Sequence, residues 1–289
     1  MNELIGTGVA LVTPFKSDMS IDFDALSNIV EHQISNGTDY LVVLGTTGET
    51  ATLNSQEKQA VIECIIRTND KRLPLVLGVG GNNTQEVAEA ISEVSVNDFC
   101  AVLSVSPYYN KPNQEGIYQH YKTIASHSKL PIIIYNVPGR TGSNMSAETQ
   151  LRLAQIPNIV ATKEASGNME QVMFILANKP KDFLVISGDD ALTYPLMALG
   201  AKGVISVINH AYPKTFSSMV QACLNGEWDK ARELHYQTLT AAVAIFEDGS
   251  PSGIKTMLNE MGLCEPFVRA PLWPVNATVD SKLRALTLK

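Results

Sequence analysis

Lys163 is the residue of this chain whose type and position most directly suggest chemistry. It follows the apolar run 159–162 (IVAT) and precedes 164–167 (EASG), so it lies at the end of an expected buried strand. Desolvation disfavours the ammonium form and lowers the pKa of a lysine, and the neutral amine attacks carbonyl carbon. Taken alone, Lys163 is more simply interpreted as a snorkelling side chain paired with a carboxylate. The rest of the sequence has to separate these interpretations.

Polar segments follow five other apolar runs, and their side chains fit a lysine that reacts with a carbonyl. They are 45–49 (GTTGE), 106–110 (SPYYN), 135–142 (YNVPGRTG), 187–190 (SGDD) and 206–209 (SVIN). Tyr135, Tyr109 and Thr46 offer hydroxyl groups for proton transfer near a Schiff base. Arg140 offers a fork suited to a carboxylate, and the turn 45–48 can present backbone N–H groups to another. The set predicts covalent chemistry on a keto acid.

Each segment also has a plain structural interpretation. The stretch 45–48 could be a tight polar turn, the pair 108–109 an interface contact, and Arg140 a solvated loop residue. The segment 78–81 (GVGG) is interpreted as a strand-end turn rather than a phosphate cradle. Glu49 is expected to hold loop backbone, and Glu164 to face away from Lys163, because neighbours on a strand point to opposite sides. The functional interpretation is favoured because the segments converge on one face of one architecture.

That architecture follows from eight short apolar runs separated by segments with helical periodicity. The runs are 5–15, 40–44, 73–79, 99–105, 131–137, 159–162, 183–186 and 203–208. Nearly continuous apolar runs are typical of parallel strands buried on both faces. The sequence therefore predicts an α/β fold, a (β/α)8 TIM barrel over residues 1–224, with a helical extension over 225–289 packed on its outside. The alternative is an open doubly wound sheet, which would need a GxGxxG turn into its first helix.

The composition of the chain disfavours several classes of binding partner. The 289 residues carry a formal net charge of −7, with 45 % hydrophobic and 18 % charged residues, and no basic stripe, which disfavours nucleic acid. Apolar runs are too short to span a membrane, and the N-terminus has no leader, so we expect a cytoplasmic protein. Four dispersed cysteines and five histidines without ligand spacing predict no metal. Asp189 and Asp190 would repel a phosphate at the loops where barrels bind one, which favours an unphosphorylated keto acid.

The motifs GTTGE (45–49), YYN (108–110), YNVPGRTG (135–142), ATKEASG (161–167) and SGDD (187–190) together resemble the dihydrodipicolinate synthase family. This is a family of class I pyruvate aldolases in the N-acetylneuraminate lyase superfamily, and the resemblance extends over essentially the whole chain. It implies a lyase of lysine biosynthesis, on the diaminopimelate route, that condenses pyruvate with L-aspartate 4-semialdehyde. The covalent intermediate is a Schiff base on Lys163, so no cofactor is expected.

The resemblance also implies roles for individual residues. Lys163 forms the imine and Tyr135 moves protons beside it, while Thr46 links Tyr135 to Tyr109 of the neighbouring subunit. Thr47 holds the pyruvate carboxylate, Arg140 receives the carboxylate of the semialdehyde, and Gly188 and Ile205 line the pocket. A tight homodimer is implied, and a homotetramer built as a dimer of dimers is the expected assembly.

Two departures from the family pattern are visible. The lysine-effector pocket of feedback-sensitive members corresponds to Thr50, Ala51, Ser55, Lys58, Asn82, Glu86 and Tyr108. Ser55 and Lys58 stand on the helix where sensitive members place histidine, and a cation at 58 repels the ammonium groups of lysine. We therefore expect weak or absent lysine inhibition. The second departure is 250–253 (SPSG), where members commonly carry Asn-Pro-Ile-Pro, and its expected effect is on local packing.

Two other functions fit part of the pattern. One is a pyruvate aldolase that cleaves a keto-sugar acid, which Arg140 disfavours because a sugar chain offers hydroxyls rather than a carboxylate. The other is a non-catalytic sensor or scaffold that binds keto acids. A binding module has no need of a proton relay, so Lys163, Tyr135, Thr46 and Tyr109 argue against it.

Overall fold

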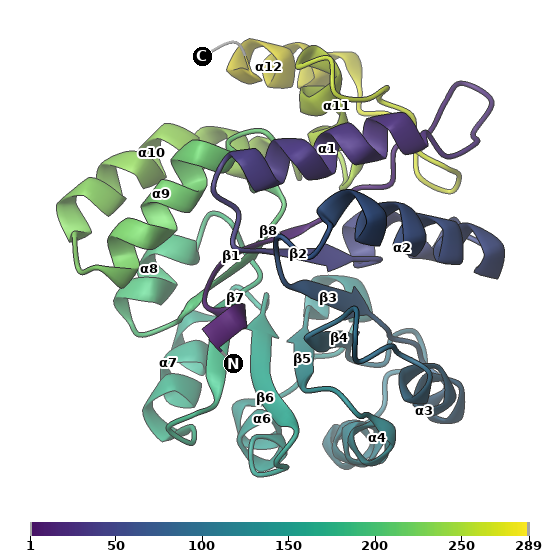
Figure 1. Ribbon diagram of the computed structural model, residues 1–289. Coiled ribbons are helices and arrows are strands. Elements are labelled where there is room, and N and C mark those ends of the chain that lie inside the picture. Colours follow the sequence, from purple (N-terminus) through teal and green to yellow (C-terminus); the bar gives the residue numbers. More distant parts are fainter. Residues whose placement is uncertain (1, 288–289) are drawn as a thin grey trace.

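The computed structural model describes residues 2–287 as a closed barrel of eight parallel strands in chain order (Figure 1). The strands are β1 (Gly6–Ala10), β2 (Tyr40–Val43), β3 (Leu75–Gly78), β4 (Ala101–Val105), β5 (Ile132–Asn136), β6 (Ile159–Glu164), β7 (Leu184–Ser187) and β8 (Gly203–Ser206). Each predicted apolar run overlaps one strand, and the β1–β8 pairing that closes the sheet excludes the open-sheet alternative. Strand β6 continues through Lys163 to Glu164, so the lysine lies within the strand rather than just after it.

Helices surround the barrel on the outside (Figure 1). Those between strands are α1 (Phe23–Ser35), α2 (Ser55–Asn69), α3 (Thr84–Ser92), α4 (Gln114–His127), α5 (Pro138–Thr141), α6 (Ala147–Leu153), α7 (Met169–Asn178) and α8 (Thr193–Ala198). Four single-turn 3-10 helices accompany them: η1 (Asn2–Leu4), η2 (Thr46–Gly48), η3 (Thr50–Thr52) and η4 (Ile208–His210). The capping box predicted before α2 is formed, with Asn54 and Glu57 bonding reciprocally, which fixes where the chain leaves the loop after β2.

The chain after β8 is helical, as predicted. It forms α9 (Pro213–Leu224), α10 (Trp228–Ala244), α11 (Ser252–Glu260) and α12 (Ala277–Thr287). Helix α10 packs on α9 and α8, while α11 and α12 pack together at one side of the barrel, where α11 contacts η4 (Figure 1). The boundary after residue 224 stays a prediction. None of the helices within residues 2–287 is long and apolar enough to cross a membrane.

Alternation along the strands separates two environments. One buried cluster lies inside the barrel and includes Tyr40, Val76, Ile133, Tyr135 and Ile205. A larger cluster lies between the strands and the surrounding helices. Because side chains two apart along a strand share a face, Lys163 follows Ala161 into the interior, whereas Thr162 and Glu164 face the helices.

Candidate active site

Lys163 and Tyr135 lie side by side inside the barrel. Strands β5 and β6 pair so that Tyr135 is opposite Lys163. The Nζ atom of Lys163 is 4.3 Å from the centroid of the Tyr135 ring. Only 5 % of Lys163 and 7 % of Tyr135 is exposed. Strand register alone therefore brings together an amine and a phenol that are 28 residues apart in the chain.

Burial shifts the pKa values of Lys163 and Tyr135 in opposite directions. It lowers the pKa of Lys163 to about 8, an effect that the negative charge of Asp190 opposes and the positive charge of Arg140 reinforces. Near neutral pH a much larger fraction of the amine is therefore neutral than in an ordinary lysine. Burial raises the pKa of Tyr135 to about 12, so its hydroxyl keeps its proton at neutral pH and can donate it.

Gly188 and Ile205 form the wall beside the lysine. A Cβ atom on Gly188 would lie 2.7 Å from Cβ of Ala165, 3.0 Å from Cε of Lys163 and 3.1 Å from its Cγ. The lysine stem thus occupies space that any other residue at 188 would fill. Ile205 is 1 % exposed and belongs to the interior cluster that contains Tyr135. Both predicted lining residues are therefore in the interior with Lys163.

Asp190 is a buried carboxylate. The sequence predicted that it would repel a phosphate, but did not predict its contacts with the backbone. Its Oδ2 accepts the backbone N–H groups of Val207, at 3.0 Å, and Ile208, at 2.8 Å. These donors follow β8, where phosphate-binding barrels place their anion. Asp190 therefore occupies such donors with its own carboxylate, in addition to repelling a phosphate. Burial raises its pKa to about 6, and its Oδ1 has no hydrogen-bond partner within residues 2–287.

Arg140 lies at the mouth of the barrel, on the single turn of α5 that Pro138 opens. Its positive charge lowers the pKa of both Lys163 and Tyr135. Its Nη2 donates to the carbonyl of Ser250 at 3.5 Å. The 250–253 departure was expected to affect packing alone, but its first residue contacts this arginine.

None of the hydrogen bonds of the predicted Thr46 relay is formed within residues 2–287. Thr46 is exposed on η2, Thr47 beside it is buried, and Tyr109 is 87 % exposed with a positive φ of 69°. Neither the Thr46 hydroxyl nor the Tyr135 hydroxyl has a hydrogen-bond partner in the described part of the chain. An exposed tyrosine and an exposed threonine are available to a second subunit. The relay itself stays a prediction.

Glu164 faces away from Lys163, as predicted, and holds the back of the site. Its carboxylate accepts hydrogen bonds from Nδ2 of Asn136 at 3.1 Å, from Nε2 of Gln150 at 2.7 Å and from the backbone N–H of Ser166 at 2.9 Å. These bonds tie β5, β6 and α6 together on the outer face of the sheet. A glutamate next to Lys163 thus serves the register of Tyr135 and Lys163 rather than chemistry.

The residues of the predicted effector pocket come from the loops after β2, β3 and β4. Thr50 and Ala51 lie on η3, Ser55 and Lys58 on the first turns of α2, Asn82 before α3, Glu86 on α3 and Tyr108 after β4. Asn110 joins two of these loops by donating to the carbonyl of Asn82 at 3.2 Å. Since β2, β3 and β4 are neighbours, the seven residues share one side of the barrel mouth.

The charges around Lys163 predict opposite pH effects for two substitutions. Asp190→Asn removes the charge that favours the ammonium form, so the pKa of Lys163 should fall further and imine formation should rise at lower pH. Arg140→Gln removes a positive charge, so the rise should move to higher pH. The measurement is the rate of borohydride-trapped pyruvate adduct against pH, with a wild-type inflection near 8. Shifts of the same sign in both variants would contradict this electrostatic assignment.

A buried lysine beside a phenol inside a (β/α)8 barrel fits the class of lysine-dependent barrel enzymes that form Schiff bases with carbonyl substrates. The model of the dihydrodipicolinate synthetase family matches residues 3–288. The chain belongs to this family and is an enzyme, a pyruvate-dependent lyase.

Similar proteins cover nearly all of the chain. A 4-hydroxy-tetrahydrodipicolinate synthase of Parabacteroides distasonis is 54 % identical over 97 % of this chain and 95 % of its own length. A dihydrodipicolinate synthase of Acinetobacter baumannii, solved in complex with pyruvate, has a TM-score of 0.95 and 40 % identity over 98 % of this chain and 97 % of that one. A dihydrodipicolinate synthase of Cyanidioschyzon merolae, solved with lysine bound, has a TM-score of 0.93 and 37 % identity. The match covers 99 % of this chain and 98 % of that one.

Proposed function

We propose that this chain makes 4-hydroxy-tetrahydrodipicolinate from pyruvate and L-aspartate 4-semialdehyde through a Schiff base on Lys163, in the diaminopimelate route to lysine. The observation that carries the proposal is the buried Lys163–Tyr135 pair, held in register by β5 and β6. The full-length similarity to proteins named as this synthase favours it over a sugar-acid aldolase or a non-catalytic binder.

The chemistry begins with the neutral amine of Lys163, which attacks the ketone carbon of pyruvate. Tyr135 donates a proton to the oxygen that leaves as water, and the imine forms. The Tyr135 phenolate then accepts a methyl proton, which gives the enamine. The enamine carbon attacks the aldehyde of the second substrate and forms the new C–C bond, and Tyr135 returns the proton to the aldehyde oxygen. The amino group of that substrate attacks the imine carbon, closes the ring and releases Lys163. No metal or cofactor has a step in this sequence.

The substrates are positioned by residues on the loops after β2 and β5. Thr47 and the neighbouring backbone bind the pyruvate carboxylate, and Arg140 binds the carboxylate of the semialdehyde as a bidentate fork. This assignment is supported by the placement of Arg140 on α5, directly after the carboxyl end of β5, the strand that carries Tyr135. We also propose a cytoplasmic location, which suits four unpaired thiols (Cys64, Cys100, Cys223 and Cys264).

Tyr109 is proposed to act in the site of a neighbouring subunit, within a homodimer that pairs into a homotetramer. Tyr109→Phe should lower kcat by about a hundredfold, because it interrupts proton transfer, and should leave folding intact, because the side chain is exposed. Kinetics and thermal unfolding measure the two effects. Tyr236→Phe, on an exposed tyrosine of α10, is the matched control.

Mixed subunits test the crossing directly. Coexpression of Tyr109→Phe with Lys163→Met should restore about a quarter of wild-type activity, since half of the dimers are hybrids and each hybrid has one complete site. If Tyr109 served its own barrel, no hybrid site would be complete and activity would stay at the level of the separate variants.

Lysine should inhibit this enzyme weakly or not at all. The ammonium of Lys58 lies on the first turns of α2 and opposes the two positive charges of the ligand. Initial rates at millimolar lysine are the measurement, and strong inhibition would contradict the expectation. Lys58→His replaces the fixed charge by the residue type of sensitive family members, and we expect this variant to gain sensitivity.

A further inference from the structure

The turn that carries Thr46 and Thr47 ends in a residue with an unfavourable backbone. Glu49 joins η2 to η3 with φ 52° and ψ 37°, the left-handed conformation. Its N–H donates to the carbonyl of Thr46 at 3.1 Å, and its carbonyl accepts the N–H of Thr52 at 3.0 Å. A glutamate has no local preference for this conformation, so its surroundings must hold it there.

The carboxylate of Glu49 is held by the C-terminal extension. Its Oε1 is 2.5 Å from Nζ of Lys255 on α11, and its Oε2 accepts the backbone N–H of Arg269 at 2.9 Å. The side chains of Glu49 and Lys255 are both completely buried. Lys255 also donates to the carbonyl of Phe267 at 2.8 Å and lies 4.3 Å from the centroid of the Phe15 ring. Both charged groups are therefore enclosed, and each has a hydrogen-bond partner besides the other.

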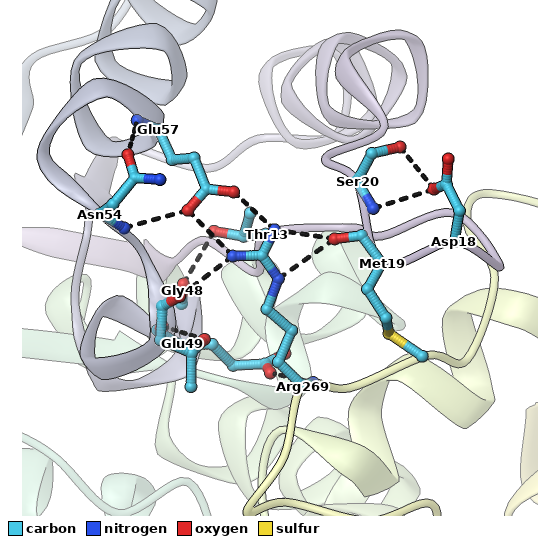
Figure 2. A network of polar contacts seen from close by, with 10 residues as sticks. Thr13, Asp18, Met19, Ser20, Gly48, Glu49, Asn54, Glu57 and Arg269 are labelled. Carbon is cyan, nitrogen blue, oxygen red and sulfur yellow. Dashed lines mark hydrogen bonds and ion pairs between the residues drawn. The ribbon is translucent and has the colours of Figure 1, made fainter.

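Arg269 binds the other end of the same segment, at Thr52. Its Nη1 donates to the carbonyl of Thr52 at 3.0 Å, and its guanidinium also binds both carboxylate oxygens of Glu57. Figure 2 shows the guanidinium between Glu57 and the carbonyl oxygen of Met19, with Glu49 and Gly48 below it. The Thr13 hydroxyl adds a bond to the carbonyl of Gly48 at 2.8 Å. Residues 48–52 are thus held from both sides.

We propose that Glu49 is a positioning residue for Thr46 and Thr47, and that Lys255 and Arg269 make the C-terminal extension the clamp of this active-site turn. The inference rests on the roles proposed above for the two threonines. The extension also reaches Arg140 through Ser250, so it touches both sides of the barrel mouth. Displacement of a catalytic group by about 1 Å can cost about a hundredfold in rate, so a clamp of this kind matters for catalysis.

The main test removes both buried charges together. Either substitution alone would leave a lone buried charge, whereas the double variant Glu49→Gln/Lys255→Met keeps the volumes and removes the charges as a pair. We expect it to fold and to lose at least about tenfold in kcat/KM for pyruvate, through a higher KM, a lower kcat, or both. A purely structural pair would lower the thermal midpoint and leave kcat and KM of the folded enzyme within twofold of wild type. That result would overturn the proposal.

A second variant decides the question if the double variant does not fold. Arg269→Met keeps its backbone N–H to Glu49 and the Lys255 pair, but loses the bonds to Thr52, Glu57 and Met19. We expect a loss of about three- to tenfold in kcat/KM, and unchanged values would overturn the clamp. Glu31→Gln/Arg72→Met breaks a half-exposed ion pair away from the turn and should change neither constant.

Two further variants separate this inference from the proposed function. Thr46→Val and Thr47→Val remove hydroxyl groups while keeping side-chain shape. If both retain wild-type kcat and KM, the proposed roles of the threonines are wrong. If they lose activity while the charge-neutral double variant and Arg269→Met retain it, the roles stand and the clamp is wrong.

Discussion

Lys163→Met should abolish the pyruvate adduct and lower turnover by at least about a thousandfold, because it removes the amine that we propose forms the imine. The side chain is buried and close in volume to methionine, and its folded-state pKa lies below that of an ordinary lysine. At pH 7 the unfolded chain therefore holds the proton more tightly, so the charged lysine destabilises the fold. Its replacement should leave the thermal midpoint unchanged or raised.

Borohydride reduction with pyruvate, followed by mass mapping, is the measurement. The wild-type chain should carry one reduced pyruvate on Lys163. The matched control is Lys122→Ala, on the exposed face of α4, which should keep both the adduct and the activity. An adduct on a different residue, or a labelled Lys163→Met protein, would refute the mechanism.

Tyr135→Phe should lower kcat by about 10²–10⁴ and slow, without abolishing, formation of the adduct. The substitution removes one oxygen from a buried ring that packs beside Nζ of Lys163. Among residues 2–287 no hydrogen bond is lost with that oxygen, so the thermal midpoint should change little. The contrast with Lys163→Met distinguishes a proton carrier from a nucleophile.

The informative comparison is between single-turnover trapping and steady-state rate. If Tyr135 moves protons, trapping of pyruvate and product formation should both fall, with KM for pyruvate changing less than kcat. Tyr40→Phe is not a suitable control because its hydroxyl bonds the carbonyl of Val204 inside the barrel. Tyr236→Phe is suitable, being exposed on α10. Undiminished kcat in Tyr135→Phe would assign the proton transfers elsewhere.

The positions of the candidate site residues could be predicted in large part, because these residues lie at strand ends. Eight apolar runs predict eight parallel strands, and the carboxyl ends of parallel strands in a barrel share one mouth. Lys163, Tyr135 and Arg140 follow from that rule, and strand alternation correctly predicts that Glu164 faces outward. The positions of Thr46 and Thr47 after β2, and of Gly188 after β7, are predicted by the same rule. The family resemblance then assigns a role to each.

The ion pair of Lys255 with Glu49 could not be predicted from the sequence. Lys255 sits among Ile254, Met257 and Leu258 on the buried face of α11, and a charge there is itself a signal of a buried partner. Its partner Glu49 lies 206 positions earlier in the chain, and no local pattern links two residues so far apart. Asp190 is similar, because its partners are backbone N–H groups, which every non-proline residue carries.

The sequence by itself determined the barrel, its order of strands and the residues at its mouth, because hydrophobic periodicity and chain order are local properties. Only the tertiary structure decided that Tyr135 is in register with Lys163, that Asp190 fills the donors after β8, and that the extension holds Glu49. Those facts depend on barrel closure and on the packing of distant segments, where burial sets both the pKa of Lys163 and the need to pair every charge.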